Sequence, residues 1–396
     1  MKRKFRIIVG MLLLAIPLCM NAQVKIAKPG QNSKEAKEEK TEQEKTEKPK
    51  DGLTMPKISG FVQGMYQANL SKDCDLLDNT LRMRRVRLSV DGNLSKTVSY
   101  KIQGDFTRSP MLVDAYVKYK PCREFAIQVG QFKTPFTLES PINPVNLEIF
   151  DYGESVQKLV GYSDVCGVGS LGRDLGIMAT GGFVPMKDDK GIYNIGDYAI
   201  GVFNGNGANV LDNNNRKDIV GRLEVHPGLK DLTLSGSYYY GKYKKDDINQ
   251  GTRNRWSVGA QYNNGDLIIR AEYLNGLTGY QVAAFNDTIP VLDEEGNQVF
   301  TEALRNSKGY YAVAGYNFKF GKEGHEQKLM PVLRYEHFEP GDMAPEVFGS
   351  TNFYTVGINY WPLKSVNFKL DYSLVQKVVG VKSNSHRVVA ILSYKF

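Results

Sequence analysis

Hydrophobic and polar residues alternate one by one along most of the chain from Lys57 to the last residue, Phe396. In the clearest run, apolar Val366, Phe368, Leu370, Tyr372 and Leu374 alternate with polar Asn367, Lys369, Asp371 and Ser373. Side chains two residues apart on a β-strand share a face, so the pattern predicts strands with one apolar and one polar face. Similar runs begin near residues 57, 81, 97, 112, 124, 173, 192, 217, 231, 253, 266, 309, 328, 354 and 388. Together they predict about 16 strands.

The lengths of these runs and of their connections suit a membrane better than a soluble β-sandwich, whose strands also alternate. The runs reach about 9 to 12 residues, which matches a tilted bilayer-spanning strand and exceeds the usual soluble strand. Counting back from Phe396, alternate connections are short, as at 226–230, 263–265 and 362–364. The intervening ones are long and polar, as at 204–216, 242–252, 277–308 and 339–351. Short turns at one rim and long loops at the other are typical of outer-membrane barrels.

Aromatic residues gather where the predicted strands meet the short connections. They are Tyr119, Phe183, Tyr262, Phe318, Phe320, Tyr360, Trp361, Tyr394 and Phe396. Aromatic rings favour a membrane interface because one part stays apolar while another reaches water. The sequence therefore predicts an all-β fold, a transmembrane antiparallel β-barrel of about 16 strands in the outer membrane of a Gram-negative cell.

The N-terminus has the pattern of an export signal. Basic residues within the first six positions precede an apolar stretch from Ile7 to Met20, and we expect cleavage after Ala22. Residues 23–56 form a charged segment that we expect to be a disordered linker, with a helix or coiled coil over 33–50 as the alternative. The barrel then occupies 57–396. Removing residues 1–22 takes away four basic residues and no acid, so the formal charge falls from +8 to +4 and gives no indication of nucleic-acid binding.

A barrel of this size encloses a water-filled channel, and charged side chains can face it. Alternation directs Arg85 and Arg87 of the second strand to the lumen, together with Lys101 of the third and Lys118 of the fourth. The pattern predicts a basic wall on one side of the channel.

An Arg-x-Glu spacing recurs on three later strands, as Arg222 with Glu224, Arg270 with Glu272, and Arg334 with Glu336. Residues two apart share a face, so we expect each pair in the lumen. Two interpretations remain open: a ladder of charges that stiffens the wall, or a direct role in solute passage.

The connection from Phe132 to Leu171 is about 40 residues long, which is unusual for a loop without a function. It is apolar enough to pack against another surface, and we expect it to fold into the barrel as a constriction loop. Its acids Glu139, Glu148, Asp151 and Glu154 would then face the arginine wall and create a field across the narrow zone. A loop lying over the mouth with its acids in solvent is the alternative.

The chain resembles the phosphate-selective porin O and P family. The resemblance covers most of residues 57–396, and its motifs are Arg84-Arg85-Val86-Arg87-Leu88, Tyr100-Lys101-Ile102-Gln103-Gly104-Asp105-Phe106, Asp114-Ala115-Tyr116-Val117 and Val129-Gly130-Gln131-Phe132-Lys133-Thr134-Pro135-Phe136. The family implies a 16-stranded outer-membrane barrel, often a homotrimer, that passes small anions along arginines and lysines. The matching positions are Arg85, Arg87, Lys101 and Lys133. The acid-rich loop departs from a lysine-lined phosphate site, which favours a general porin with a modest anion preference.

No catalytic, metal or cofactor motif points to an enzyme. Gly167-Val168-Gly169-Ser170-Leu171-Gly172 matches a nucleotide-binding pattern but leads into a strand, and the four His are scattered. We therefore expect passive diffusion of small hydrophilic solutes, anionic or polar, with no cofactor. The expected partners are outer-membrane lipid and the barrel-assembly machinery, which Phe396 would engage. A dedicated phosphate channel is one alternative, and a closed barrel acting as an adhesin or surface scaffold is another.

Overall fold

A computed structural model describes residues 52–70, 79–169, 171–188, 191–246, 250–286, 289–322, 325–341, 349–379 and 381–396. The predicted signal segment and residues 23–51 of the predicted linker lie outside these ranges. Among the described residues, no helix is long and apolar enough to cross a membrane.

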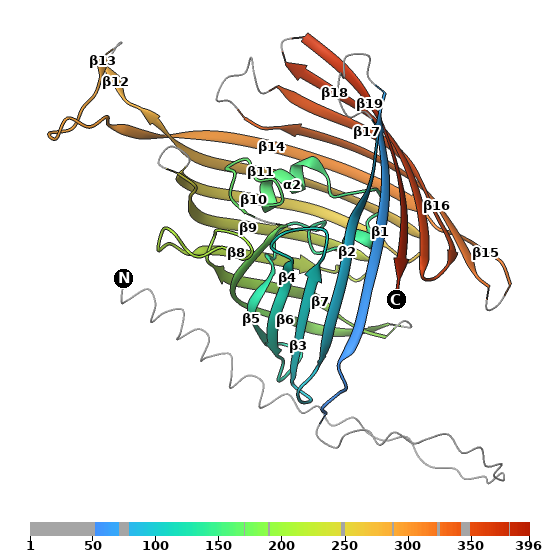
Figure 1. The fold of residues 1–396 in the computed structure, drawn as a ribbon. Helices are drawn as coiled ribbons and strands as arrows, with labels where there is room; N and C mark the ends of the chain where they lie inside the picture. The colour runs from blue at the N-terminus through green and yellow to red at the C-terminus, as the bar shows by residue number, and fades with distance from the viewer. Residues whose placement is uncertain are drawn as a thin grey trace, which may run out of the picture.

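One antiparallel sheet closes on itself as a barrel (Figure 1). Its strands are β1 (Lys57–Asn69), β2 (Asn79–Asn93), β3 (Val98–Asp105), β4 (Leu112–Tyr119), β5 (Ala126–Lys133), β6 (Arg173–Asp188), β7 (Gly191–Phe203), β8 (Asp218–Val225), β9 (Leu232–Lys244), β10 (Gln250–Asn263), β11 (Leu267–Ala283), β14 (Phe300–Tyr316), β15 (Phe318–Phe320), β16 (Gln327–Glu339), β17 (Ser350–Leu363), β18 (Val366–Val379) and β19 (Val381–Lys395). Each strand pairs with its neighbour in sequence, and β19 pairs with β1. Because β14 and β15 both pair with β16 and only Asn317 separates them, they form one interrupted strand of a 16-stranded barrel.

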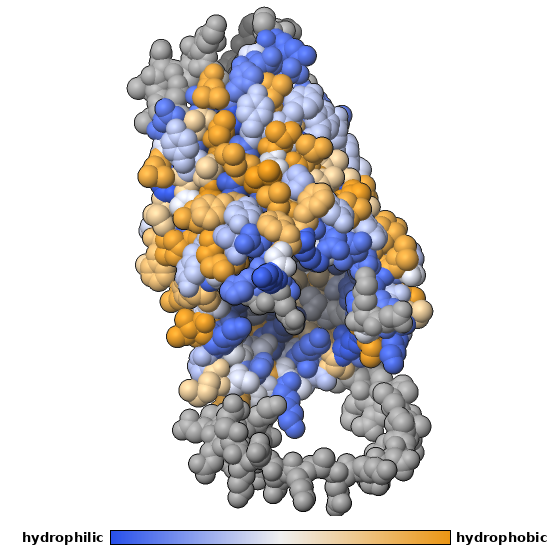
Figure 2. Space-filling view, turned by 90° about the vertical axis from the view of Figure 1, so that its right-hand side faces the viewer, coloured by the Kyte–Doolittle hydropathy of each residue, from blue (hydrophilic) through white to orange (hydrophobic). Residues whose placement is uncertain are grey.

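Alternation places apolar residues outside and polar residues inside, the reverse of a soluble protein. On β18, Phe368 and Leu370 are 48% and 51% exposed, whereas Lys369 between them is buried. Figure 2 shows hydrophobic residues spread over one side of the molecule and hydrophilic residues around a hollow near one end. An apolar outer surface of this extent is what lipid chains cover.

The connections follow the predicted alternation of short and long. The turn between β10 and β11 spans 264–266, whereas the loop between β5 and β6 spans 134–172. The connection predicted at 277–308 is shorter than expected, because β11 and β14 stay paired as far as Ala283 with Phe300. Beyond them lies a separate small hairpin of β12 (Phe285–Asn286) and β13 (Ile289–Pro290). Backbone hydrogen bonds between strands do not require apolar side chains. The alternation of hydrophobic and polar residues therefore did not predict the polar ends of β11 and β14.

A β-bulge interrupts the alternation of β2. Gln63 of β1 lies opposite Arg85, but the next residue, Gly64, lies opposite Met83, so Arg84 is the extra residue. A bulge shifts the side-chain pattern by one position. Arg84 and Arg85 consequently both point inward, whereas Met83 is exposed on the outer face.

The loop between β5 and β6 packs against the inner wall of one side of the barrel. It contains a short 3₁₀ turn, η2 (Pro144–Asn146), and one helix, α2 (Glu154–Val160), which ends at Gly161 with a φ of 95° that favours glycine. Its apolar side chains join inward-facing residues of the barrel in one buried cluster. From the loop these are Phe136, Leu147, Ile149, Tyr152, Val156, Leu159 and Val160, and from the wall they include Phe203, Val220, Tyr239, Leu274, Val313, Val332 and Phe338. The interior is thus packed along β7–β16.

Candidate functional site

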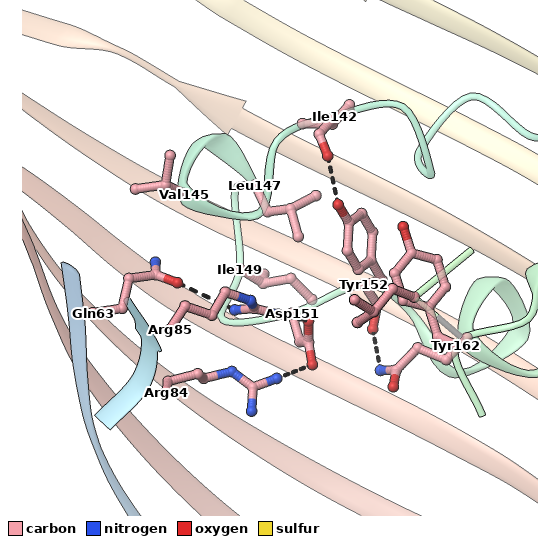
Figure 3. A network of polar contacts seen from close by, with 12 residues as sticks. Gln63, Arg84, Arg85, Ile142, Val145, Leu147, Ile149, Asp151, Tyr152 and Tyr162 are labelled. Carbon is pink, nitrogen blue, oxygen red and sulfur yellow. Dashed lines mark hydrogen bonds and ion pairs between the residues drawn. The ribbon is translucent and has the colours of Figure 1, made fainter. Parts of the chain in front are cut away.

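The carboxylate of Asp151 ties the loop to β2. It contacts the guanidinium groups of Arg84 and Arg85, the latter with a distance of 2.8 Å from Nη2 to Oδ1 (Figure 3). Gln63 of β1 accepts a further hydrogen bond from Arg85 Nη1 at 3.2 Å. All three charged side chains are largely buried, so this cluster is a contact ion pair network rather than two charged walls facing each other across water.

Two of the three Arg-x-Glu pairs bind the loop, and in one of them Arg334 also lies 3.4 Å from its own partner Glu336. Arg334 donates to both oxygens of Glu139, with 3.2 Å from Nη2 to Oε2, and Arg270 donates to Glu148. Their glutamate partners take loop donors as well. Glu336 accepts from the backbone N–H and hydroxyl of Ser155 at 2.9 and 2.8 Å. Glu272 accepts from the backbone N–H of Leu138 at 2.9 Å and from the Tyr311 hydroxyl at 3.0 Å.

In the third pair the arginine likewise contacts both its own glutamate and the loop. Arg222 Nε lies 3.2 Å from Glu224 Oε1, and Arg222 also donates to the carbonyl of Thr137 at 3.0 Å. Loop contact is therefore common to all three arginines. Holding the loop is a third role for these arginines, beside the two interpretations that the sequence left open.

Several further side chains of the barrel wall hydrogen-bond to the loop, and the sequence did not indicate them. Arg255 of β10 holds Asp164 with two hydrogen bonds of 2.6 and 2.7 Å. Lys369 of β18 donates to the carbonyl of Ile149 at 2.9 Å, and Asn359 of β17 to that of Glu148 at 2.7 Å. Alternation places these side chains inward, but no local spacing indicates that their partners lie more than 90 residues away.

Lys133 and Glu154, both expected from the sequence to line the channel or its constriction, differ in how far water reaches them. Lys133 is partly buried, and its ammonium donates to the carbonyl of Ile142 at 2.9 Å and to the Tyr152 hydroxyl at 2.8 Å, so it fastens the loop at its start. Glu154, at the first turn of α2, is partly exposed and lies 3.6 Å from Lys158. Glu154 is the loop acid that remains accessible to water.

Along β2–β6 the loop contacts the wall at some points and leaves part of the lumen open. A cavity of about 210 Å³ lies between the loop and the wall, bordered by Arg87, Lys101, Asp114, Lys133 and Arg173 among others. Two of these arginines are neutralised by buried contacts. Arg87 Nε lies 2.9 Å from Asp105, and Arg173 Nε lies 2.7 Å from Asp114.

The lysines of this wall are less compensated. Lys101 is 30% exposed, and its ammonium lies 3.9 Å from Asp114, which is already engaged by Arg173. Lys118 forms no ion pair with the part of the chain that the structure describes. It borders a cavity of about 330 Å³ together with Lys120 and Arg123. Positive charge that is only partly compensated therefore gathers on β3, β4 and the turn that follows.

No group of three or more His, Cys, Asp or Glu is arranged to hold a metal ion within the described ranges. The charged side chains of the lumen are instead arranged as loop anchors on one side and as a hydrated basic wall on the other. This arrangement can select solutes by size and charge.

Solved structures with the same fold are known porins and channels. An anion-selective porin from Comamonas acidovorans has a TM-score of 0.58 and 12% sequence identity, covering 86% of this chain and 99% of its own. The outer membrane channel DcaP of Acinetobacter baumannii has a TM-score of 0.55 at 14% identity, covering 86% and 97%. OmpT of Vibrio cholerae, in a trimer form, has a TM-score of 0.55 at 11% identity, covering 87% and 100%. At these identities the likeness shows the fold alone.

No curated protein matches the sequence. The family model described as phosphate-selective porin O and P matches residues 57–396, which is the whole barrel. Family and fold both point to a channel rather than an enzyme. The chain belongs to the phosphate-selective porin O and P family.

Proposed function

We propose that the protein is an outer-membrane porin that lets small hydrophilic solutes diffuse passively, with a preference for anions set by Lys101 and Lys118. The proposal rests on a difference in pairing between the acidic and the basic side chains of the lumen. The loop acids Glu139, Glu148 and Asp151 are each held by arginines. Lys118 borders a cavity, and Lys101 is 30% exposed, with its ammonium 3.9 Å from a carboxylate that Arg173 already engages. The side of the channel that remains open is therefore the positively charged one.

Contact ion pairs and free charges act differently on a passing ion. A paired carboxylate and guanidinium form a dipole whose field falls off within a few ångströms, whereas an unpaired charge acts over roughly 10 Å at ordinary salt. The lysine wall thus dominates the potential along the path. Arg85 and Arg87 contribute mainly by holding Asp151 and Asp105.

We also propose a homotrimer. Three neighbouring strands, β3, β4 and β5, have eight residues each, fewer than the 9 to 11 that usually cross a bilayer. Neighbouring copies would shelter this short wall from lipid, and OmpT of Vibrio cholerae was solved as a trimer. Phosphate as a particular solute is the finer alternative that the family description suggests.

Single-channel recording in planar bilayers tests the proposal. Under a KCl gradient, the reversal potential should indicate anion preference, and the double variant Lys101→Gln with Lys118→Gln should move it toward zero. Lys364→Gln is the matched control, because this lysine is 89% exposed on a turn and pairs with Glu326. An unchanged reversal potential in the double variant would contradict the assignment. Block of chloride current by low phosphate would favour the phosphate channel, and the absence of current steps would favour a closed scaffold.

A further inference from the structure

The loop has a second face, toward the rim with the long connections, and this face borders a cavity of about 300 Å³. Its walls come from β1, β2, β16, β17, β19 and the loop segment 149–157. A solute arriving from that rim meets this cavity before the lysine wall. The cavity has no part in the preference proposed above.

Guanidinium groups from two strands on either side of β1 reach the cavity. Arg82 of β2 is exposed and Arg387 of β19 is half-buried, and neither forms an ion pair with the described part of the chain. Arg387 Nε is buried without a hydrogen-bond partner among the described residues. Arg84 also borders the cavity but is engaged by Asp151.

The carboxylates in the same lining have other partners. Asp151 accepts from Arg84 and Arg85, Glu336 accepts from Ser155, and Glu154 lies 3.6 Å from Lys158. A carboxylate that entered the cavity would therefore find available donors on Arg82 and Arg387. Arginine suits such a group because its planar fork can bind both oxygens.

Aromatic rings stand beside these donors. The guanidinium of Arg387 lies over the ring of Phe150, with 4.5 Å from its central carbon to the ring centroid. Phe353 of β17 and Tyr152 of the loop also border the cavity. Stacking on Phe150 fixes the plane of the guanidinium and leaves its edge for a ligand, while the rings offer contact to an apolar body.

We propose that this cavity is a binding site for organic carboxylates with a flat apolar body, for which benzoate is a probe. The inference rests on the proposed porin function, since it names a solute class that the channel would take up. The carboxylate hydrogen-bonds to Arg387 and Arg82, and the ring lies against the aromatic side chains. Acetate has the same charge without the ring and serves as the comparison.

Chloride current through single channels is recorded with benzoate or acetate on the side of the long loops. Benzoate should reduce the current at a concentration at least about tenfold lower than acetate. Arg387→Gln should raise the half-blocking concentration of benzoate about tenfold, as expected for loss of a hydrogen bond to a charged group. Lys118→Gln, on the far side of the loop, should change the reversal potential but leave the benzoate block unaltered.

Equal block by benzoate and acetate, or an unaltered block in Arg387→Gln, would overturn the inference while the porin function stands. Equilibrium dialysis of the detergent-solubilised barrel against labelled benzoate measures the same site without current. A protein that gives no current steps would reject the proposed porin function, and dialysis would still decide whether benzoate binds and whether Arg387→Gln weakens it. The heat-dependent shift in gel mobility of folded barrels shows that each variant is folded.

Discussion

Asp151 joins two consecutive arginines of β2 to the loop, and this single carboxylate therefore supports both the loop position and the local charge balance. Asp151→Asn should lower the free energy of unfolding by about 3 kcal/mol, because removing one member of a buried ion pair leaves the others uncompensated. The same variant should increase anion preference, since the charge of the two guanidinium groups is no longer partly offset by a carboxylate. Urea unfolding and reversal potentials measure the two effects.

Glu154→Gln is the matched control for this variant. Its pair with Lys158 is about one third exposed, and exposed pairs contribute roughly 1 kcal/mol or less. An equal loss of stability in both variants would mean that Asp151 is not an anchor.

A second residue-level prediction concerns Cys166, which lies in the loop and is buried. Burial raises the pKa of its thiol to about 11, and the neighbouring Asp164 carboxylate adds to the shift. Only the thiolate reacts readily with alkylating agents, so Cys166 should resist iodoacetamide at pH 8 in the folded barrel and react after unfolding. Peptide mapping by mass spectrometry distinguishes the two states, and complete labelling of folded protein would contradict the prediction.

At the level of elements, the loop of residues 134–172 behaves as a small packed unit inside the barrel, fixed by both its apolar cluster and its ion pairs. Burial alone would raise the pKa of Asp164, but the charge and hydrogen bonds of Arg255 hold it below its usual value. A lowered pKa stabilises the folded loop above the unfolded value of about 4 and loses this contribution as pH falls through the folded value.

Acid should therefore loosen the loop. We expect current fluctuations to increase as the pH falls below about 4, and Asp164→Asn to show similar fluctuations already at pH 7. Recordings at pH 7 and over the acid range below pH 4 check this, with Lys364→Gln as the control. An Asp164→Asn channel as quiet at pH 7 as the wild type would show that this ion pair does not hold the loop.

The strands were predictable from sequence because their signal is local. Alternation gave about 16 of them, with starts within a few residues except where the ends are polar, as at the beginning of β14. It also indicated the inward position of Arg85 and Arg87. Alternation alone does not account for the inward position of Arg84, because one bulge residue shifts the pattern and nothing in the local sequence marks it.

The loop contacts were less predictable because they join residues far apart in the chain. One signal was present. Val389 and Ile391 interrupt the alternation of β19 on its polar face, and the structure packs them with Met65 near Phe150 of the loop. Apolar residues at lumen-facing positions of a strand thus indicate where another segment of the chain packs against the inner wall of the barrel. The identity of each ion-pair partner depends on the loop path, which periodicity does not contain.

For the molecule as a whole, the hairpin β12–β13 forms its own two-stranded sheet beyond the barrel (Figure 1). Replacing residues 284–299 with a short turn should leave conductance and ion preference unchanged, because the barrel ladder already ends at Ala283 and Phe300. Bilayer recording and the folded gel mobility check both points. Loss of current without unfolding would mean that this hairpin belongs to the pathway.

The bulge at Arg84 in β2 affects how mutations in this strand should be designed. Deleting Arg84 would restore an unbroken alternation and leave Leu81 and Met83 facing lipid and Arg82 facing water, because Arg84 is the residue without a partner on β1. Loss of this one amino acid should therefore remove one of the two arginines that hold Asp151 without turning either half of the strand over, and mutagenesis of this strand needs opposite odd–even rules on its two sides.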